Sequence, residues 1–138
     1  MGAKTVVRSL LDTHGLLWWA SDDPRLSADA RSHVEKDSIL ISAASIWEIA
    51  IKFRKGKLAI AERFITDLPA YIQEQGFTMV PITPIHALRA GLLPIGKNSD
   101  PFDRMLVAQA LEESRHPEAI AIISNDDRLD GYGVKRIW

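Results

Sequence analysis

Short apolar runs that alternate with amphipathic stretches constrain the fold of this chain more than any other feature. Runs of strand length recur at residues 6–11, 38–41, 77–82, 119–123 and 134–138. The segments between them are too long for hairpin turns, and most of them carry apolar residues at helical spacing. This order predicts an α/β fold of three layers, in which helices cover both faces of a central, mostly parallel sheet.

Cap residues and helix breakers help to place the helices between these runs. The predicted helices cover residues 28–36, 46–55, 61–75, 85–92 and 101–111. Ser27 is a favoured N-cap for the first of them, and Gly56 is expected to end the second. Pro69 lies inside the third, where a proline must kink or break the helix because it cannot donate the backbone hydrogen bond.

Length and composition exclude several classes of protein. The 138 residues suffice for a single domain, 1–138, with residues 1–5 as a loose N-terminal extension. Cysteine is absent, which excludes disulfides, thiolate metal ligands and cysteine nucleophiles. No apolar run approaches the roughly 18 residues of a membrane span. We therefore expect a soluble, cytoplasmic protein with no membrane partner.

Four acidic residues follow predicted strands or stand near the start of predicted helices: Asp12, Glu48, Asp103 and Asp126. The carboxyl ends of the strands form the ligand crevice of an open α/β sheet, so topology alone brings three of these acids to one edge. Asp103 joins them if its helix packs at the same edge. The four residues are therefore the candidate site.

Each acid also has a purely structural interpretation at a helix N-terminus. Asp12 and Asp126 are favoured N-cap residues, and Asp100 precedes a proline, which is typical of a cap. Ser45 and Glu48 match a capping box, in which the glutamate reaches back to the serine amide. Capping does not require the acids to meet, however, and four carboxylates in one crevice repel one another strongly at low dielectric.

Protons or divalent cations must relieve that repulsion. Oxygen ligands in a chain without cysteine suit Mg²⁺ or Mn²⁺, which bind carboxylates and water. One or two such ions can orient a water, lower its pKa and clamp a scissile phosphate. The four acids therefore point to metal-dependent hydrolysis of a phosphodiester. Phosphate-binding glycine loops are absent from the sequence, so no nucleotide cofactor is expected.

Several segments, in order along the chain, resemble the signatures of VapC-type toxins of the PIN-domain family. They are LLDTH at 10–14, SAASIWEIAIK at 42–52, GKL at 56–58, DPFDRMLVAQA at 100–110, SND at 124–126 and YGV at 132–134. The resemblance extends from about residue 6 to residue 138. A single such motif is weak, whereas the ordered set is specific.

The resemblance implies a PIN-like α/β/α domain that is the endoribonuclease toxin of a type II toxin–antitoxin pair and uses Mg²⁺, with Mn²⁺ as a substitute. The acidic quartet of the family matches Asp12, Glu48, Asp103 and Asp126. Its hydroxyl residue before the last acid matches Ser124, and Thr13 is in a position to support Asp12. Family members typically dimerise and are silenced by a small antitoxin, so RNA, an antitoxin and a second copy are the expected partners.

Some assignments stay open at this point. Asp127 directly follows Asp126 and is the alternative fourth acid, although the Ser-x-Asp spacing favours Asp126. The candidate RNA contacts are Lys52, Arg54, Lys55 and Arg104, and an ordinary solvated helix end explains the first three equally well. Trp47 is expected in the core or at a dimer interface, with stacking on RNA as its second interpretation.

The main alternative function is a non-catalytic α/β binding or regulatory module with an acidic, metal-binding pocket. A phospho-acceptor receiver domain of that kind would place a lysine after its late strand, where this chain has Asp126. The formal charge of −1 does not exclude RNA. Without the four candidate acids, 14 acidic residues face 17 basic ones, so the remaining charge is +3.

Overall fold

The computed structural model describes residues 7–60, 62–96, 98–114 and 119–138. A five-stranded sheet lies at its centre in the order β3-β2-β1-β4-β5, and every neighbouring pair is parallel. The strands are β1 (Arg8–Leu11), β2 (Ser38–Ser42), β3 (Thr78–Val80), β4 (Ala121–Ile123) and β5 (Arg136–Ile137). The predicted α/β class and parallel sheet are confirmed.

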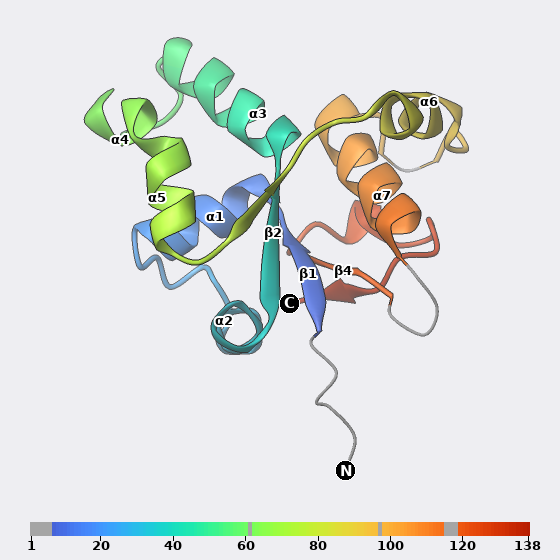
Figure 1. Ribbon diagram of the computed structural model, residues 1–138, viewed down its shortest axis with the longest axis horizontal. Coiled ribbons are helices and arrows are strands. Elements are labelled where there is room, and N and C mark those ends of the chain that lie inside the picture. The colour runs from blue at the N-terminus through green and yellow to red at the C-terminus, as the bar shows by residue number, and fades with distance from the viewer. Residues whose placement is uncertain (1–6, 61, 97, 115–118) are drawn as a thin grey trace.

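Seven α-helices and one 3₁₀ turn connect the described strands (Figure 1). They are α1 (Thr13–Ala20), α2 (Ala28–Lys36), α3 (Ala43–Arg54), α4 (Glu62–Thr66), α5 (Leu68–Glu74), α6 (Pro84–Leu92), α7 (Pro101–Glu113) and η1 (Asp127–Leu129). None of these helices is long and apolar enough to cross a membrane.

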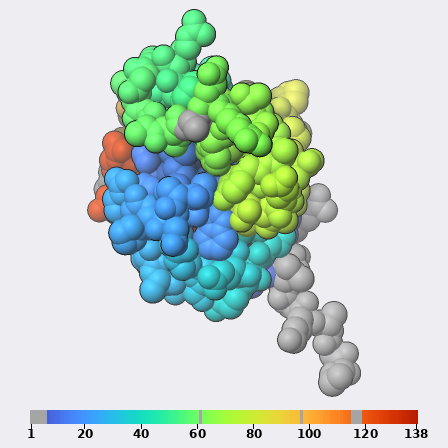
Figure 2. Space-filling model, turned by 90° about the vertical axis from the view of Figure 1, so that its left-hand side faces the viewer, coloured from blue at the N-terminus to red at the C-terminus, as the bar shows by residue number. Residues whose placement is uncertain are grey.

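Alternating side chains of the strands fill two separate cores. Leu11 and Ile123 point to one face of the sheet, where they pack with buried residues of α1, α2, α3 and α5. Leu10 and Ile122 point to the other face, which α7 covers with Leu106. Figure 2 shows the first face from outside, with α1 and α2 in blue and α4 and α5 in green. The helices therefore form the two outer layers.

The main differences from the sequence prediction have local causes. The predicted helix 61–75 is broken at Asp67 into α4 and α5, with Pro69 in the first turn of α5, where its missing N–H costs nothing. Helix α1 was not predicted, and it begins directly after β1 because Asp12 caps it. Residues 1–5 and 61 lie outside the described residues, as does Val6 of the predicted first strand.

The capping-box interpretation of Ser45 and Glu48 is wrong. Helix α3 begins at Ala43, immediately after β2, and its N-cap is Ser42, whose hydroxyl accepts a hydrogen bond from the Ala44 amide at 3.0 Å. Ser45 is already inside the helix and buried. Glu48 therefore does not cap α3, and its side chain lines the pocket described below.

Candidate active site

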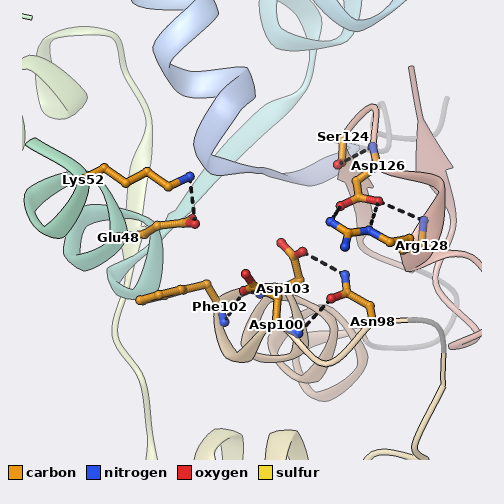
Figure 3. A network of polar contacts seen from close by, with 9 residues as sticks. All are labelled: Glu48, Lys52, Asn98, Asp100, Phe102, Asp103, Ser124, Asp126 and Arg128. Carbon is orange, nitrogen blue, oxygen red and sulfur yellow. Dashed lines mark hydrogen bonds and ion pairs between the residues drawn. The ribbon is translucent and has the colours of Figure 1, made fainter. Parts of the chain in front are cut away.

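The four candidate acids line one pocket at the carboxyl edge of the sheet. Figure 3 shows three of them, Glu48, Asp103 and Asp126, with their polar contacts. The pocket has a volume of about 430 Å³. Asp12 follows β1, Glu48 belongs to α3, Asp103 lies in the first turn of α7, and Asp126 follows β4. The lining of the pocket also includes Thr13, His14, Lys52, Asp100, Asp127 and Arg128.

Asp12 is the most deeply buried of the four acids, with 6% of its surface exposed. It caps α1 by accepting a hydrogen bond from the Gly15 amide at 2.7 Å, as the structural interpretation predicts, and a second bond from the Ser124 hydroxyl. Its pKa is raised from 3.8 to about 6, mainly by burial; the Glu48 and Asp126 carboxylates act in the same direction, and the two hydrogen bonds oppose them. Capping therefore does not exclude Asp12 from the acidic cluster.

Glu48 is held by two side chains. The Thr13 hydroxyl donates a hydrogen bond to its Oε1 at 2.5 Å, and Lys52, one turn further along α3, pairs with its Oε2 at 3.2 Å. The sequence interpretation had Thr13 supporting Asp12, which is its neighbour in the chain. In the structure Thr13 instead orients Glu48, because its side chain points from the first turn of α1 toward α3.

Asp103 is held by a buried asparagine that the sequence reasoning missed. The Asn98 amide donates to Asp103 Oδ2 at 2.8 Å, while its Oδ1 accepts from the Asp100 amide at 2.9 Å. Asp100 caps α7 through the Phe102 and Asp103 amides, as predicted. The pKa of Asp103 is raised to about 6, mainly by burial; the nearby acids Asp100, Asp126 and Glu48 act in the same direction, and the Asn98 hydrogen bond opposes them.

Asp126 is paired with Arg128, a second residue that the sequence reasoning missed. The guanidinium contacts both carboxylate oxygens at 3.0 and 2.8 Å, and the Arg128 amide donates to Oδ1 as Asp126 caps η1. These hydrogen bonds lower the pKa of Asp126. The Ser124 hydroxyl accepts a bond from the Asp126 amide at 3.1 Å, so Ser124 connects Asp126 with Asp12. In the sequence, the only sign of this pairing is that Arg128 stands two residues after Asp126.

The predicted RNA contacts lie in three different environments. Lys52 lines the acidic pocket. Arg54 and Lys55 lie at the exposed end of α3 along a separate shallow groove. The Arg104 guanidinium donates to the carbonyl oxygens of Ala90, Leu93 and Pro94 at 2.7 to 3.2 Å, and so it binds the C-terminal end of α6 and the loop after it. This structural role separates Arg104 from the other three.

The carboxylates fit a hard divalent cation by their chemistry. Asp12 and Asp103 accept hydrogen bonds from neutral donors only, and among the described residues neither carboxylate has a cationic partner. Oxygen donors with uncompensated charge are what Mg²⁺ or Mn²⁺ prefers. In the described arrangement no three acidic or histidine side chains stand close enough to hold one ion together. A bound ion would therefore keep several waters, as Mg²⁺ commonly does.

Comparison with known proteins agrees with this geometry. The sequence profile of the PIN domain matches residues 9–135. Ribonuclease VapC22 of Mycobacterium tuberculosis is 31% identical over 136 residues, which cover 94% of this chain and 97% of the relative. Ribonuclease VapC16 of the same organism is 41% identical over 69 residues, or 46% of this chain and 49% of the relative.

A solved structure supports the fold independently. The crystal structure of DNA-bound VapBC from Salmonella typhimurium contains a chain that matches with a TM-score of 0.61 and 14% identity, over 96% of this chain and 97% of that one. This likeness concerns the fold alone. The profile match and the similarity to VapC22 over almost the full length show that the chain belongs to the PIN-domain family, as a protein of the VapC type.

Proposed function

We propose that this chain is an Mg²⁺- or Mn²⁺-dependent endoribonuclease and the toxin of a type II toxin–antitoxin pair. The observation that carries the proposal is the meeting of Asp12 and Asp103, two acids without a cationic partner among the described residues, with Glu48 and Asp126 in one open pocket. The similarity to two ribonucleases of the VapC type supports RNA as the substrate.

The residues of the pocket have distinct tasks in this proposal. Asp12 and Asp103 hold the metal ion, with Asp126 and Glu48 as the further acids of the site. When bound, the ion supplies a water of lowered pKa and neutralises charge on the phosphate. Thr13 and Ser124 fix the orientation of Glu48 and Asp12 through the hydrogen bonds described above.

Cationic side chains beside the acids bind the phosphate backbone. Lys52 and Arg128 line the pocket and are the cations best placed to contact the phosphate at the cleavage point. Arg54 and Lys55 are exposed at the end of α3, where they can attract the strand outside the pocket. Arg104 is not part of the proposed RNA surface, because three of its N–H groups donate to backbone carbonyls at the end of α6.

The proposal includes partners and a location. A small antitoxin silences the enzyme, in agreement with the VapBC complex among the structural relatives. A homodimer is the proposed state in solution, and the exposed apolar side chains of Ile85, Leu88 and Leu92 on α6 support it. Cellular RNA as the substrate places the protein in the cytoplasm. Measurement of the molar mass in solution, with and without the antitoxin, tests both associations.

Cleavage of a defined single-stranded RNA by the purified protein tests the proposed reaction. We expect cleavage with Mg²⁺ or Mn²⁺ and none with EDTA, and we expect Asp12→Asn or Asp103→Asn to abolish it while the circular dichroism spectrum stays unchanged. Cleavage by either variant at the wild-type rate would refute the role of the acids. Metal binding without cleavage of RNA would instead favour the regulatory module.

The fourth acid is assigned by a matched pair of variants. Asp126→Asn and Asp127→Asn make the same change at neighbouring positions of the same pocket. We expect the first to lose most of the cleavage and the second to retain it, because Asp126 is the residue that acts electrostatically on both Asp12 and Asp103. The opposite result would move the fourth acid to Asp127.

A further inference from the structure

Trp47 is the most exposed aromatic side chain among the described residues. It lies on α3, directly before Glu48, and 61% of its surface is exposed. The expectation that Trp47 belongs to the core is therefore wrong. A large apolar ring held in solvent commonly marks a binding surface, because its exposure costs free energy that the fold does not recover.

The Phe102 ring on α7 contacts the Trp47 ring on α3. The two ring centroids are 5.2 Å apart and the planes are inclined by 72°, which is the favourable edge-to-face arrangement. Phe102 directly precedes Asp103 in the first turn of α7, and its amide donates to the capping carboxylate of Asp100 at 2.8 Å. The contact and the cap at the start of α7 favour one arrangement of the two rings.

The Trp47–Phe102 pair joins the two helices that carry Glu48 and Asp103. Each ring belongs to the residue immediately before one of these acids, although neither ring is part of the pocket lining itself. The pair therefore lies beside the acidic pocket, where α3 and α7 meet. Figure 3 shows the Phe102 side chain extending from α7 toward α3, beneath Glu48. An aromatic surface thus adjoins the place where a scissile phosphate would lie.

We propose that the Trp47–Phe102 pair is a stacking platform for one base of single-stranded RNA, next to the phosphate that lies in the acidic pocket. This inference rests on the proposed ribonuclease function. A nucleotide carries its base one sugar away from its phosphate, so a strand held at the acids brings a base to the border of the pocket. Only an unpaired strand offers a free base face for stacking.

Steady-state cleavage of single-stranded RNA by variants at position 47 tests the platform. Loss of one stacked base is worth roughly a five- to hundredfold change in binding. We expect Trp47→Ala to raise KM by that factor with kcat nearly unchanged, because the platform touches a base and not the reacting phosphate. Trp47→Phe should retain most of the affinity. Trp47→Leu should lose it, since it keeps apolar volume without an aromatic face.

An RNA with a single abasic nucleotide gives the sharper measurement. We expect one position beside the cleaved bond at which removal of the base raises the KM of the wild-type protein as much as Trp47→Ala does. With the Trp47→Ala protein, the abasic RNA and the intact RNA should then bind alike, because both changes remove the same contact. If the increases in KM caused by the abasic nucleotide and by Trp47→Ala were independent and multiplied each other, the proposed stacking contact would be refuted.

Phe64→Ala provides a matched control for the loss of an aromatic ring. Phe64 on α4 forms a similar pair with Tyr71 on α5, with ring centroids 5.3 Å apart, and neither α4 nor α5 contributes a residue to the acidic pocket, whereas α3 and α7 do. We expect this variant to keep the wild-type KM. Equal losses from Phe64→Ala and Trp47→Ala would overturn the proposal.

The outcomes separate the platform from the function on which it rests. If the wild-type protein cleaves RNA and Trp47→Ala has the same KM for it, the platform is refuted and the ribonuclease stands. If the wild-type protein neither binds nor cleaves RNA, both are refuted. If Trp47→Ala changes the molar mass in solution and leaves the KM per subunit unchanged, Trp47 belongs to a protein interface instead.

Discussion

Replacement of Asp12 by asparagine is expected to stabilise the metal-free protein at neutral pH. The carboxylate is buried and its pKa is raised from 3.8 to about 6, so the folded state holds its charged form at a cost. At 1.36 kcal/mol for each pKa unit, the cost at pH 7 is up to about 3 kcal/mol. An asparagine removes the charge and keeps the shape, the cap bond from Gly15 and a polar partner for Ser124.

The direction of the pH dependence follows from the raised pKa of Asp12. Below about pH 4 the carboxyl is protonated in both the folded and the unfolded chain, and the cost is absent. Between about pH 4 and 6 the unfolded chain releases the proton while the folded chain retains it, so this contribution to stability falls as the pH rises. Above about pH 6 the full cost is present. Asp103 contributes in the same direction, because burial raises its pKa as well.

Thermal and urea unfolding in EDTA at pH 4.5 and pH 7 measures the effect. For a chain of 138 residues, 3 kcal/mol corresponds to a rise in Tm of about 10 °C. We expect Asp12→Asn to raise the Tm by up to that amount at pH 7 and by about a third of it at pH 4.5, where the unfolded chain has already released most of the proton. An added divalent ion should stabilise the wild type more than the variant. A variant that is less stable than the wild type at pH 7 in EDTA would refute the reasoning.

Three further variants test individual contacts. Arg128→Gln removes the cation that occupies the Asp126 carboxylate, so we expect Mn²⁺ to bind roughly three- to tenfold more tightly by calorimetry; an unchanged affinity would contradict this competition. His86→Ala removes a side chain that is 1% exposed and has bonds on both ring nitrogens, and urea unfolding should show a loss of about 2–4 kcal/mol. Thr13→Val should reduce cleavage several-fold at unchanged Tm, because Glu48 loses its orienting hydrogen bond, and Thr13→Ser should restore the activity.

The position of the acids could be predicted because it follows from topology. In a parallel sheet with buried strands, the residue after each strand lies at the carboxyl edge, whatever the details of the loops. The apolar runs located β1, β2 and β4 closely enough to place Asp12, Glu48 and Asp126 on that edge. Their assignment as metal ligands stays a proposal, because convergence alone does not identify the ligand.

The orientation of the supporting side chains could not be predicted, because it depends on contacts between distant segments. Thr13 lies 35 residues from Glu48, and nothing near it in the chain indicates that it faces α3 instead of Asp12. Arg104 carries the charge of an RNA contact, yet its position relative to the end of α6 commits it to backbone carbonyls. A local sequence pattern therefore shows which type of side chain is present, but it does not show which distant residue that side chain contacts.

The N-cap of α3 shows that the local sequence can also leave a choice between neighbouring residues undecided, here between Ser42 and Ser45. Both serines are favoured caps, and the capping-box pattern with Glu48 favoured Ser45. The deciding fact is that β2 ends at Ser42 and the helix begins at the next residue. That early start places Glu48 in the second turn, beyond the reach of a cap and on the side that faces α1, where the Thr13 hydroxyl contacts it.

The four acids are equivalent in the sequence, whereas the structure divides them into two kinds. Glu48 and Asp126 are each paired with a cation, Lys52 and Arg128, while Asp12 and Asp103 have neutral hydrogen-bond donors and raised pKa values. Asp100 and Asp127 line the same pocket, so its acidic side chains outnumber Lys52 and Arg128 and an excess of negative charge remains. The protein therefore neutralises only part of the negative charge in its acidic pocket, and a bound cation would neutralise more of it. The burial that destabilises Asp12 in the absence of metal is what would make the pocket bind one.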